Sequence, residues 1–307
     1  MNLLHAILLG IIQGLTEFLP ISSTAHLTIA ENLLLGKSMP LAFDVLLHVG
    51  TLAALVIYFR QDISKVVSGI FGRDAEGLRL AWLLFMAMIP TGILAIGTKS
   101  FKESAKDHLW LYGVFLIATA IMLWGANYLA KRKQGRAMLE MNTLDALCIG
   151  AIQGLGGGFG LSRSGSTISV GVFRGIQLSE STRFSFLLGI PTITAAALVE
   201  GRHLVKAIFQ ANASVSGGLF PAGSSNPLLL CAVGVCAAGV SGYFAINLLD
   251  RLTKRPRLGV FAIYCLIVGA CLCGCGFASV SSCEYGFASV PRAQPQLHTH
   301  FTSLSSP

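Results

Sequence analysis

Charged residues are scarce in this sequence. Only 12% of its 307 residues are Asp, Glu, Lys or Arg, whereas a soluble domain carries about a quarter. Hydrophobic residues make up 53% of the chain. Because so few charges cannot cover a water-facing surface, the composition excludes an ordinary soluble domain and indicates an integral membrane protein.

Three patterns that would indicate other classes are also missing. The run Cys271, Cys273 and Cys275 ends an apolar segment and lacks the C-x2-C spacing of structural zinc sites, so we interpret these cysteines as small hydrophobic residues. The basic residues behind the net charge of +8 are not interleaved with aromatics, which argues against a nucleic-acid partner. The N-terminus has no basic region or cleavage site of a removable signal peptide.

Several apolar segments are long enough to cross a hydrocarbon core of roughly 30 Å. We therefore expect an all-α polytopic membrane protein, with residues 1–275 forming a single membrane domain. The six predicted transmembrane helices are Phe43–Phe59, Leu80–Gly97, Leu109–Ala130, Phe184–Val199, Leu228–Leu249 and Leu258–Gly274.

Two further apolar stretches, Leu3–Leu15 and Leu144–Leu155, are too short to span. Helix-breaking residues follow each of them: Pro20 after the first, and the glycines of 156–160 after the second. Broken backbone at membrane depth is tolerated only inside protein or beside a wet cavity. We therefore predict two re-entrant helical hairpins that meet near the midplane and hold a polar site.

The two short stretches are copies of one another, which indicates an internal duplication with repeats at about 3–139 and 143–275. Each repeat holds one hairpin and three spans. Because three is odd, the second repeat must be inverted in the membrane, an arrangement that places the functional site near the midplane. The matches are Gly10 with Gly150, Gln13–Leu15 with Gln153–Leu155 and Ser22 with Ser162 at an offset of 140, and Phe43 with Phe184 and Thr51 with Thr192 at an offset of 141.

The basic residues predict an orientation. They concentrate in the loops 60–79, 131–136 and 251–257, which fall on the same side of the predicted bundle. The positive-inside rule makes that side cytoplasmic. The segment 276–307 repeats Gly-Phe-Ala-Ser-Val and then becomes rich in Ser, Pro, Gln and His, so we predict a disordered tail. His298 and His300 lie in that tail and are interpreted as solvated rather than metal-binding.

The first hairpin concentrates polar groups within apolar sequence. An ionisable residue inside a membrane is costly and is a functional candidate by default. The alternative is a capped helix end whose carboxylate is paired with an arginine elsewhere. A spacing of four places Gln13 and Glu17 on one face if the segment is helical. The candidates of this hairpin are Gln13, Glu17, Ser22, Ser23, Thr24 and His26.

The second hairpin supplies a guanidinium, hydroxyls and a glycine-rich backbone. Backbone N–H groups of such a loop can form a nest for phosphate oxygens, and arginine adds bidentate recognition. The alternative is that the glycines allow close helix packing and that Arg163 neutralises Glu17. The candidates of this hairpin are Ser162, Arg163, Ser164, Gly165 and Thr167.

Brought together, the two hairpins predict a phosphate site. Arg163 would hold the phosphate and stabilise its charge during transfer. Ser23 or His26 would attack phosphorus, and His26 is also suited to proton transfer near neutral pH. Glu17 would hold a divalent cation, orient His26 or activate water, and the residues leave these alternatives open.

Both hairpin motifs resemble those of the undecaprenyl-diphosphatases, the bacitracin-resistance proteins of bacteria. The stretch Gln13–His26 is similar to the (E/Q)-x-x-x-E motif of that family and its Pro-Val-Ser-Ser-Thr-Gly-His continuation. Ser162–Thr167 is similar to its Pro-Gly-x-Ser-Arg-Ser-Gly-x-Thr motif, and the runs 43–51 and 261–264 are also typical. The likeness covers about residues 3–275. It departs at Phe159, Ala25 and Cys265, where relatives usually carry Pro, Gly and Arg.

This resemblance implies a membrane-embedded phosphatase that hydrolyses undecaprenyl diphosphate to undecaprenyl phosphate and inorganic phosphate. It implies a divalent cation, Mg²⁺ or Ca²⁺, with Glu17 as a tentative ligand, and a site opening to the outer face of the cytoplasmic membrane. Its partners would be the polyprenyl diphosphate lipid and the bilayer. The enzyme would recycle the lipid carrier of cell-wall synthesis and confer bacitracin resistance. The matching functional positions are Glu17, Ser23, His26 and Arg163, with Gln13, Ser162, Ser164 and Thr167 in support.

A transporter of an anionic polyprenyl phosphate lipid is the strongest alternative, because inverted repeats with broken helices are typical of transporters. Such a carrier needs Arg163 but has little need of a nucleophile or of His26. The hydroxyl and histidine set therefore favours the phosphatase. The oligomeric state is left open by the sequence.

Overall fold

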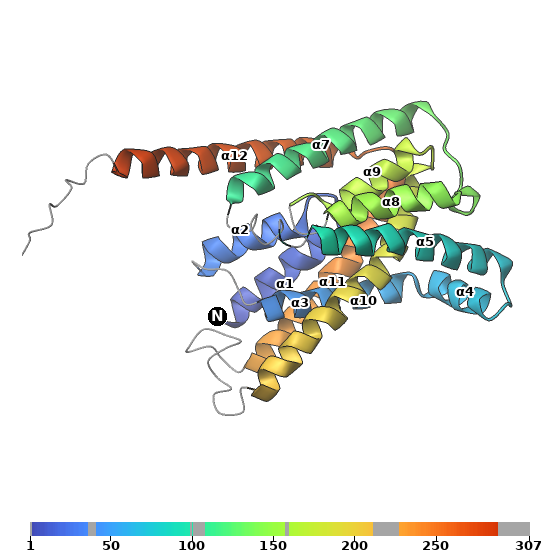
Figure 1. Cartoon of the computed structure of the whole chain (residues 1–307), viewed down its shortest axis with the longest axis horizontal. Helices are drawn as coiled ribbons and strands as arrows, with labels where there is room; N and C mark the ends of the chain where they lie inside the picture. Colours follow the sequence, from blue (N-terminus) through green and yellow to red (C-terminus); the bar gives the residue numbers. More distant parts are fainter. Residues whose placement is uncertain are drawn as a thin grey trace, which may run out of the picture.

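The computed structural model describes residues 2–35, 41–98, 100, 108–156, 160–210 and 227–287. The regular elements within these ranges are all helices, so the prediction of an all-α polytopic protein is confirmed. Figure 1 shows them stacked in a bundle, with α7 and α12 lying side by side along one edge. The helices are α1 Leu3–Phe18, α2 Ser23–Leu35, α3 Leu41–Tyr58, α4 Arg60–Ile70, α5 Ala75–Gly97, α7 Leu109–Arg132, the 3₁₀ turn η1 Met138–Glu140, α8 Thr143–Gly156, α9 Arg163–Phe173, α10 Leu178–Gln210, α11 Pro227–Thr253 and α12 Gly259–Phe287.

Four of these helices are long and apolar enough to cross a membrane, which makes the chain a multi-pass membrane protein. They contain four of the six predicted spans. The other two predicted spans correspond to α3, which bends by 77° into α4, and to the shorter apolar stretch Gly259–Gly274 of α12. The count of six therefore stays a prediction. The four long spans are Ala75–Gly97, Leu109–Arg132, Leu178–Val199 and Leu229–Thr253.

Two boundaries differ from the sequence-based expectation. The segment after the first span was expected to be a loop, but residues 60–70 form α4, which folds back onto α5. The close approach depends on glycine, since a Cβ on Gly77 would lie 1.9 Å from the Lys65 carbonyl oxygen. The second difference is that α12 continues as a helix to Phe287, past the predicted start of the tail at 276. Residues 288–307 lie outside the described part of the chain.

Many large apolar side chains lie on the outer surface and several polar side chains lie in the interior, the reverse of the distribution in a soluble protein. Large apolar residues such as Trp82, Ile121 and Phe244 are exposed on the outer faces of the helices. The interior holds polar groups together with its apolar core, among them Gln13 and Gln153, which are at most 3% exposed. This arrangement suits a lipid environment, where polar groups are favourable only when protein surrounds them.

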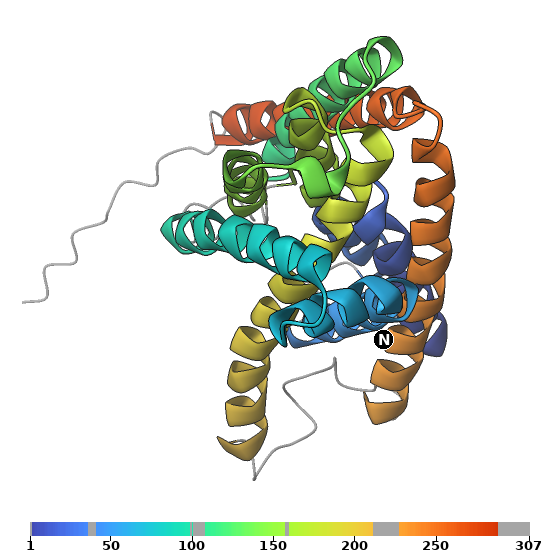
Figure 2. The ribbon, with the colours of Figure 1, turned by 90° about the vertical axis from the view of Figure 1, so that its right-hand side faces the viewer.

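The two hairpins pack on the rest of the chain in equivalent ways. Helix α1 lies along α11 of the second half, and α8 lies along α5 of the first half, as both views of the ribbon show (Figures 1 and 2). Both contacts use a Gly-x-x-x-Gly pair, Gly10 with Gly14 and Gly150 with Gly154, which lets the backbones approach closely. The equivalent contacts support the duplication read from the sequence.

Hydroxyls complete these two helix contacts in the same way. The Thr91 hydroxyl of α5 donates to the Gly150 carbonyl at 2.8 Å. The Ser241 hydroxyl of α11 lies 3.5 Å from the Gly10 carbonyl oxygen. Each hairpin is therefore fastened to the opposite half of the chain, which brings the two hairpin tips together.

Candidate functional site

The site lies where the two hairpins turn. Helix α1 ends at Phe18 and α2 begins at Ser23, while α9 begins at Arg163 directly after the turn of the second hairpin. Because α2 and α9 both start here, the partial positive charges of two helix N-termini converge on the site. Such ends favour an anionic group.

The turn of the first hairpin contains a strained residue. Ser22 has a φ of 71° and is the one non-glycine residue in the described part of the chain with a positive φ. A non-glycine residue in this region costs of order 1–3 kcal/mol and persists only where its surroundings enforce it. The Ser22 hydroxyl accepts from the Ala25 N–H at 3.4 Å, so it caps α2 while the backbone directs Ser23 toward Glu17.

Glu17 is the centre of the contacts between the hairpins. It is 7% exposed, and its Oε1 accepts a hydrogen bond of 2.7 Å from Nη2 of Arg163. Its Oε2 accepts from the Ser23 hydroxyl at 2.7 Å and from the Gln13 amide at 3.1 Å. The prediction that Gln13 and Glu17 share a helix face is confirmed by this last bond.

Arg163 carries the positive charge of the second hairpin into the site. Its side chain is 13% exposed, and the ion pair with Glu17 uses only Nη2. Nη1 is buried and has no protein partner. The Gln13 Oε1 atom is likewise buried without a protein partner. Each of these two atoms keeps hydrogen-bonding capacity that the described protein does not use.

His26 contacts Tyr264 of α12. Its Nδ1 lies 2.8 Å from the Ser22 carbonyl oxygen, and its Nε2 lies 2.7 Å from the Tyr264 hydroxyl. A carbonyl oxygen only accepts, so Nδ1 carries the proton and Nε2 accepts from Tyr264 when the ring is neutral. The two rings also stack, with centroids 5.6 Å apart and planes inclined by 18°. The structure thus joins His26 to Tyr264 rather than to Glu17.

The hydroxyls of the second hairpin are bonded within the protein. The Ser162 hydroxyl caps α9 by accepting from the Gly165 N–H at 3.1 Å. The Ser164 hydroxyl donates to the Leu19 carbonyl of the first hairpin at 3.3 Å, and Thr167 donates to the Arg163 carbonyl at 2.7 Å. These contacts fix the N-terminus of α9 against the first hairpin. Their predicted role in phosphate binding stays a prediction.

The remaining candidates fall at the edge of the site or outside the described residues. Thr24 is exposed at the first turn of α2. The glycine nest is described only at Gly156 and Gly160, and Gly160 adopts a φ of +90° with the Tyr112 ring packed against it. Residues 157–159, including the departure at Phe159, are not among the described residues.

Sequence reasoning missed His48 of α3 and the contact of Tyr264. The His48 Nε2 atom lies 3.5 Å from Glu17 Oε2, and its Nδ1 bonds the Asp44 carbonyl oxygen at 2.8 Å. A signal for His48 was available, since it is an ionisable residue inside an apolar segment. Tyr264 gave no such signal, because a tyrosine in an apolar helix is common and its partner lies 238 residues away.

The donor set decides what kind of metal the site would suit. In the part of the chain that the structure describes, no group of three or more His, Cys, Asp and Glu residues gathers. A closed protein cage is therefore not formed there. Glu17 and the free Gln13 amide oxygen are hard oxygen donors of the kind that Mg²⁺ and Ca²⁺ take, and Mg²⁺ commonly binds through one or two carboxylates plus substrate phosphates.

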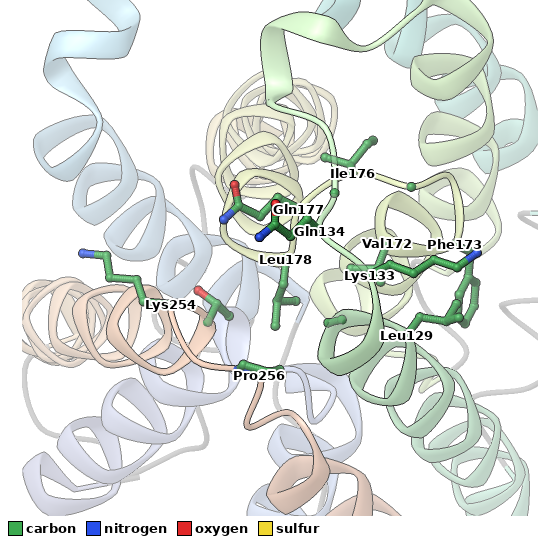
Figure 3. Close-up of a pocket in the computed structure, with 14 residues that line it drawn as sticks. Leu129, Lys133, Gln134, Val172, Phe173, Ile176, Gln177, Leu178, Lys254 and Pro256 are labelled. Atoms are coloured by element: carbon green, nitrogen blue, oxygen red, sulfur yellow. The ribbon is translucent and has the colours of Figure 1, made fainter.

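A cavity of about 500 Å³ lies apart from the hairpin turns, at the predicted cytoplasmic end. It is bordered by the end of α7, the turn between α9 and α10, and the connection from α11 to α12. Gln134, Gln177, Lys133 and Lys254 are among the side chains that line it (Figure 3). Lys254 is paired with Asp250 at 2.9 Å. None of the candidate site residues lines it.

Comparison with known proteins connects this geometry to a family. The family model described as bacitracin resistance protein BacA matches residues 6–271. The chain belongs to this family. The matched range includes both hairpins and all the candidate residues, whereas the segment after 271 lies beyond it.

Individual relatives agree with the family match over most of their length. The chain is 40% identical to an undecaprenyl-diphosphatase of Syntrophotalea carbinolica, a match that covers 88% of this chain and 97% of the relative. It is 36% identical to undecaprenyl-diphosphatases of Carboxydothermus hydrogenoformans and Methanosphaera stadtmanae, covering 88% of this chain and 95% and 96% of those proteins. The resemblance seen in the two hairpin motifs is thus confirmed.

Proposed function

We propose that the protein is a membrane-embedded undecaprenyl-diphosphate phosphatase, which releases inorganic phosphate and returns undecaprenyl phosphate for cell-wall synthesis. One observation carries this proposal. The buried Arg163–Glu17 pair meets a serine hydroxyl at the point where two helix N-termini converge, and Nη1 of Arg163 has no hydrogen-bond partner in the protein. Family membership supplies the substrate class, and resistance to bacitracin follows from a larger supply of the monophosphate carrier.

The geometry favours Ser23 as the nucleophile. Its hydroxyl donates to Glu17 at 2.7 Å, which is the distance between a nucleophile and a base able to take its proton. Ser23 Oγ would form a bond to the terminal phosphorus while the bond from that phosphorus to the bridging oxygen breaks. The proton passes to Glu17, which gives it up to the oxygen of the departing undecaprenyl phosphate. The carboxylate then takes a proton from a water molecule that attacks the phosphorus of the phosphoserine. The bond from that phosphorus to Ser23 Oγ breaks, Oγ regains a proton from Glu17, and inorganic phosphate leaves.

Arg163 would hold the phosphoryl oxygens throughout this transfer. Its Nη2 stays on Glu17, and Nη1 donates to the substrate, so the guanidinium links the base and the phosphate. His26, held by Tyr264, would act on the lipid-phosphate side as a proton donor or acceptor. In an alternative assignment, Nε2 of His26 attacks phosphorus, and it must then leave the Tyr264 hydroxyl.

A divalent cation would fit beside Glu17 and Gln13. It would be held jointly by these oxygen donors and by the phosphates of the substrate, and it would neutralise part of their negative charge. The site is proposed to open to the outer face of the cytoplasmic membrane, because the positive-inside rule predicts that the end of the bundle with the basic loops is cytoplasmic.

The test is release of inorganic phosphate from undecaprenyl diphosphate by detergent-purified protein, with and without Mg²⁺ or Ca²⁺, beside the Arg163→Ala variant. We expect release that requires the cation and disappears in the variant. Absence of release from folded, cation-supplied protein would refute the phosphatase. Headgroup translocation in liposomes would then test the transporter.

A further inference from the structure

The alignment of the two repeats pairs a histidine that contacts the site with a glycine that has no side chain. Aligning Phe43 with Phe184 and Thr51 with Thr192 places His48 of α3 opposite Gly189 of α10. His48 contacts Glu17, in the hairpin of the same repeat, at 3.5 Å. At the equivalent position of the second half there is no side chain at all.

The missing side chain makes room for the guanidinium. A Cβ built on Gly189 would lie 2.4 Å from Nη1 of Arg163, 3.4 Å from its Cζ and 3.6 Å from its Nη2. These three atoms of one side chain are its nearest neighbours. Any larger residue at 189 would therefore press on Arg163, on the side of the nitrogen that has no protein partner.

We propose that Gly189 is a positioning residue that sets the orientation of Arg163 for phosphate binding. The inference rests on the proposed function for its kinetic consequence. Because the guanidinium lies at the end of a flexible side chain, it yields to a new methyl group more easily than the helix backbone does. The clash would then be relieved by moving Arg163 away from Glu17, with the fold retained.

This mechanism differs from the packing role of the other glycines of the bundle. Gly10 and Gly150 face the backbone of a neighbouring helix, so a side chain there would separate two helices. The three atoms nearest to a Cβ on Gly189 all belong to the side chain of Arg163. Adding a methyl group inside a helix also raises helix propensity, which offsets part of the cost of moving Arg163 away from Glu17. The stability of a G189A variant should therefore fall less than that of Arg163→Ala.

The experiment compares Gly189→Ala with Gly92→Ala, a control in α5 at which an added Cβ meets nothing within 4 Å. Phosphate release from undecaprenyl diphosphate gives kcat/KM, and thermal unfolding in detergent gives Tm. We expect G189A to lower kcat/KM about 100-fold, the loss typical of a displacement near 1 Å, with a smaller loss of Tm than Arg163→Ala shows. We expect G92A to match the wild type in both.

Repeating the Gly189→Ala substitution in a variant with an altered residue 163 separates an effect on the position of Arg163 from a general effect on activity. Lysine has one terminal nitrogen and lacks Nη1, so G189A in the Arg163→Lys background should change kcat/KM less than about threefold. An equal loss in both backgrounds, or wild-type kcat/KM in G189A, would overturn the inference.

An experimental structure of the G189A variant tests the same inference without turnover. We expect the Nη2 to Glu17 Oε1 distance to exceed the 2.7 Å of the parent protein. An unchanged distance would contradict the positioning role. If the wild type releases no phosphate, the proposed function fails, and this structure alone decides whether Gly189 positions Arg163.

Discussion

Replacing Arg163 with alanine should affect stability and activity by separable routes. The substitution leaves the Glu17 carboxylate, which is only 7% exposed, without the guanidinium of its ion pair. Breaking a buried ion pair by removing one partner costs about 3–5 kcal/mol. Glu17 keeps its bonds from Ser23 and Gln13, so we expect the lower end, about 3 kcal/mol. That loss corresponds to roughly a 100-fold shift in the folding equilibrium.

The double variant Glu17→Gln with Arg163→Ala supplies the control. It removes both charges, so no unpaired ion is left buried, and most of the stability lost in the single variant should return. Phosphate release should remain absent, because neither the guanidinium nor the carboxylate is present. Stability and activity should thus separate in this variant.

The assay measures unfolding in detergent by intrinsic tryptophan fluorescence, beside phosphate release from undecaprenyl diphosphate. Two results would refute the reasoning. Near wild-type release by Arg163→Ala would remove Arg163 from phosphate binding. A double variant as unstable as Arg163→Ala alone would show that the loss arises from packing of the arginine and not from the unpaired Glu17.

Three further predictions concern other parts of the molecule. His26→Ala should abolish phosphate release while the protein still inserts and folds, and a wild-type kcat in this variant would exclude a catalytic role for the imidazole. Tyr264→Phe keeps the stacked ring but loses the hydroxyl that bonds His26. It should lower kcat by about 2–12-fold, the equivalent of one hydrogen bond. The Asp145 side chain is fully buried and ion-paired with Arg136 and Arg174, which are 40% and 35% exposed. Because water still solvates the two arginines, Asp145→Asn should lower stability by only about 1.5–3 kcal/mol, the contribution of hydrogen bonds to a charged group. Turnover per folded molecule should stay near normal, and unchanged unfolding would contradict this structural role. Gly150→Ala should prevent α8 from packing on α5, because the new Cβ would lie 1.9 Å from a backbone oxygen of α5. The yield of folded protein, measured by size-exclusion chromatography with Gly92→Ala as the control, should therefore fall sharply. A normal yield would refute the close approach of the two helices.

Local patterns in the sequence predicted much of the fold. The low charge and the apolar segments identified the membrane class, and the short stretches before Pro20 and Gly156 marked the two hairpins. Helical periodicity placed Gln13 and Glu17 on one face, and the bond between them confirms it. The helix α4 was missed because it is short and amphipathic, and a search for long apolar runs takes such a segment for a loop.

The sequence predicted which residues belong to the candidate site better than it predicted the contacts between them. Glu17 and Arg163 stood out because an ionised side chain in a membrane requires a partner, and the structure pairs them. His26 was expected beside them, yet it bonds Tyr264 of α12. The hydroxyls of Ser162, Ser164 and Thr167 were expected to face a phosphate, and they cap and fasten α9.

By itself the sequence determined the membrane class, the duplication, and which residues bear charge inside the bilayer, because each depends on composition or on spacing within one helix. Only the tertiary structure decided that Arg163 reaches Glu17 across 146 residues, that Tyr264 holds His26, and that Gly189 leaves space for a guanidinium. Those contacts depend on how each hairpin lies along the opposite half of the chain. Close packing of small residues between whole helices sets that placement, and no local pattern encodes it.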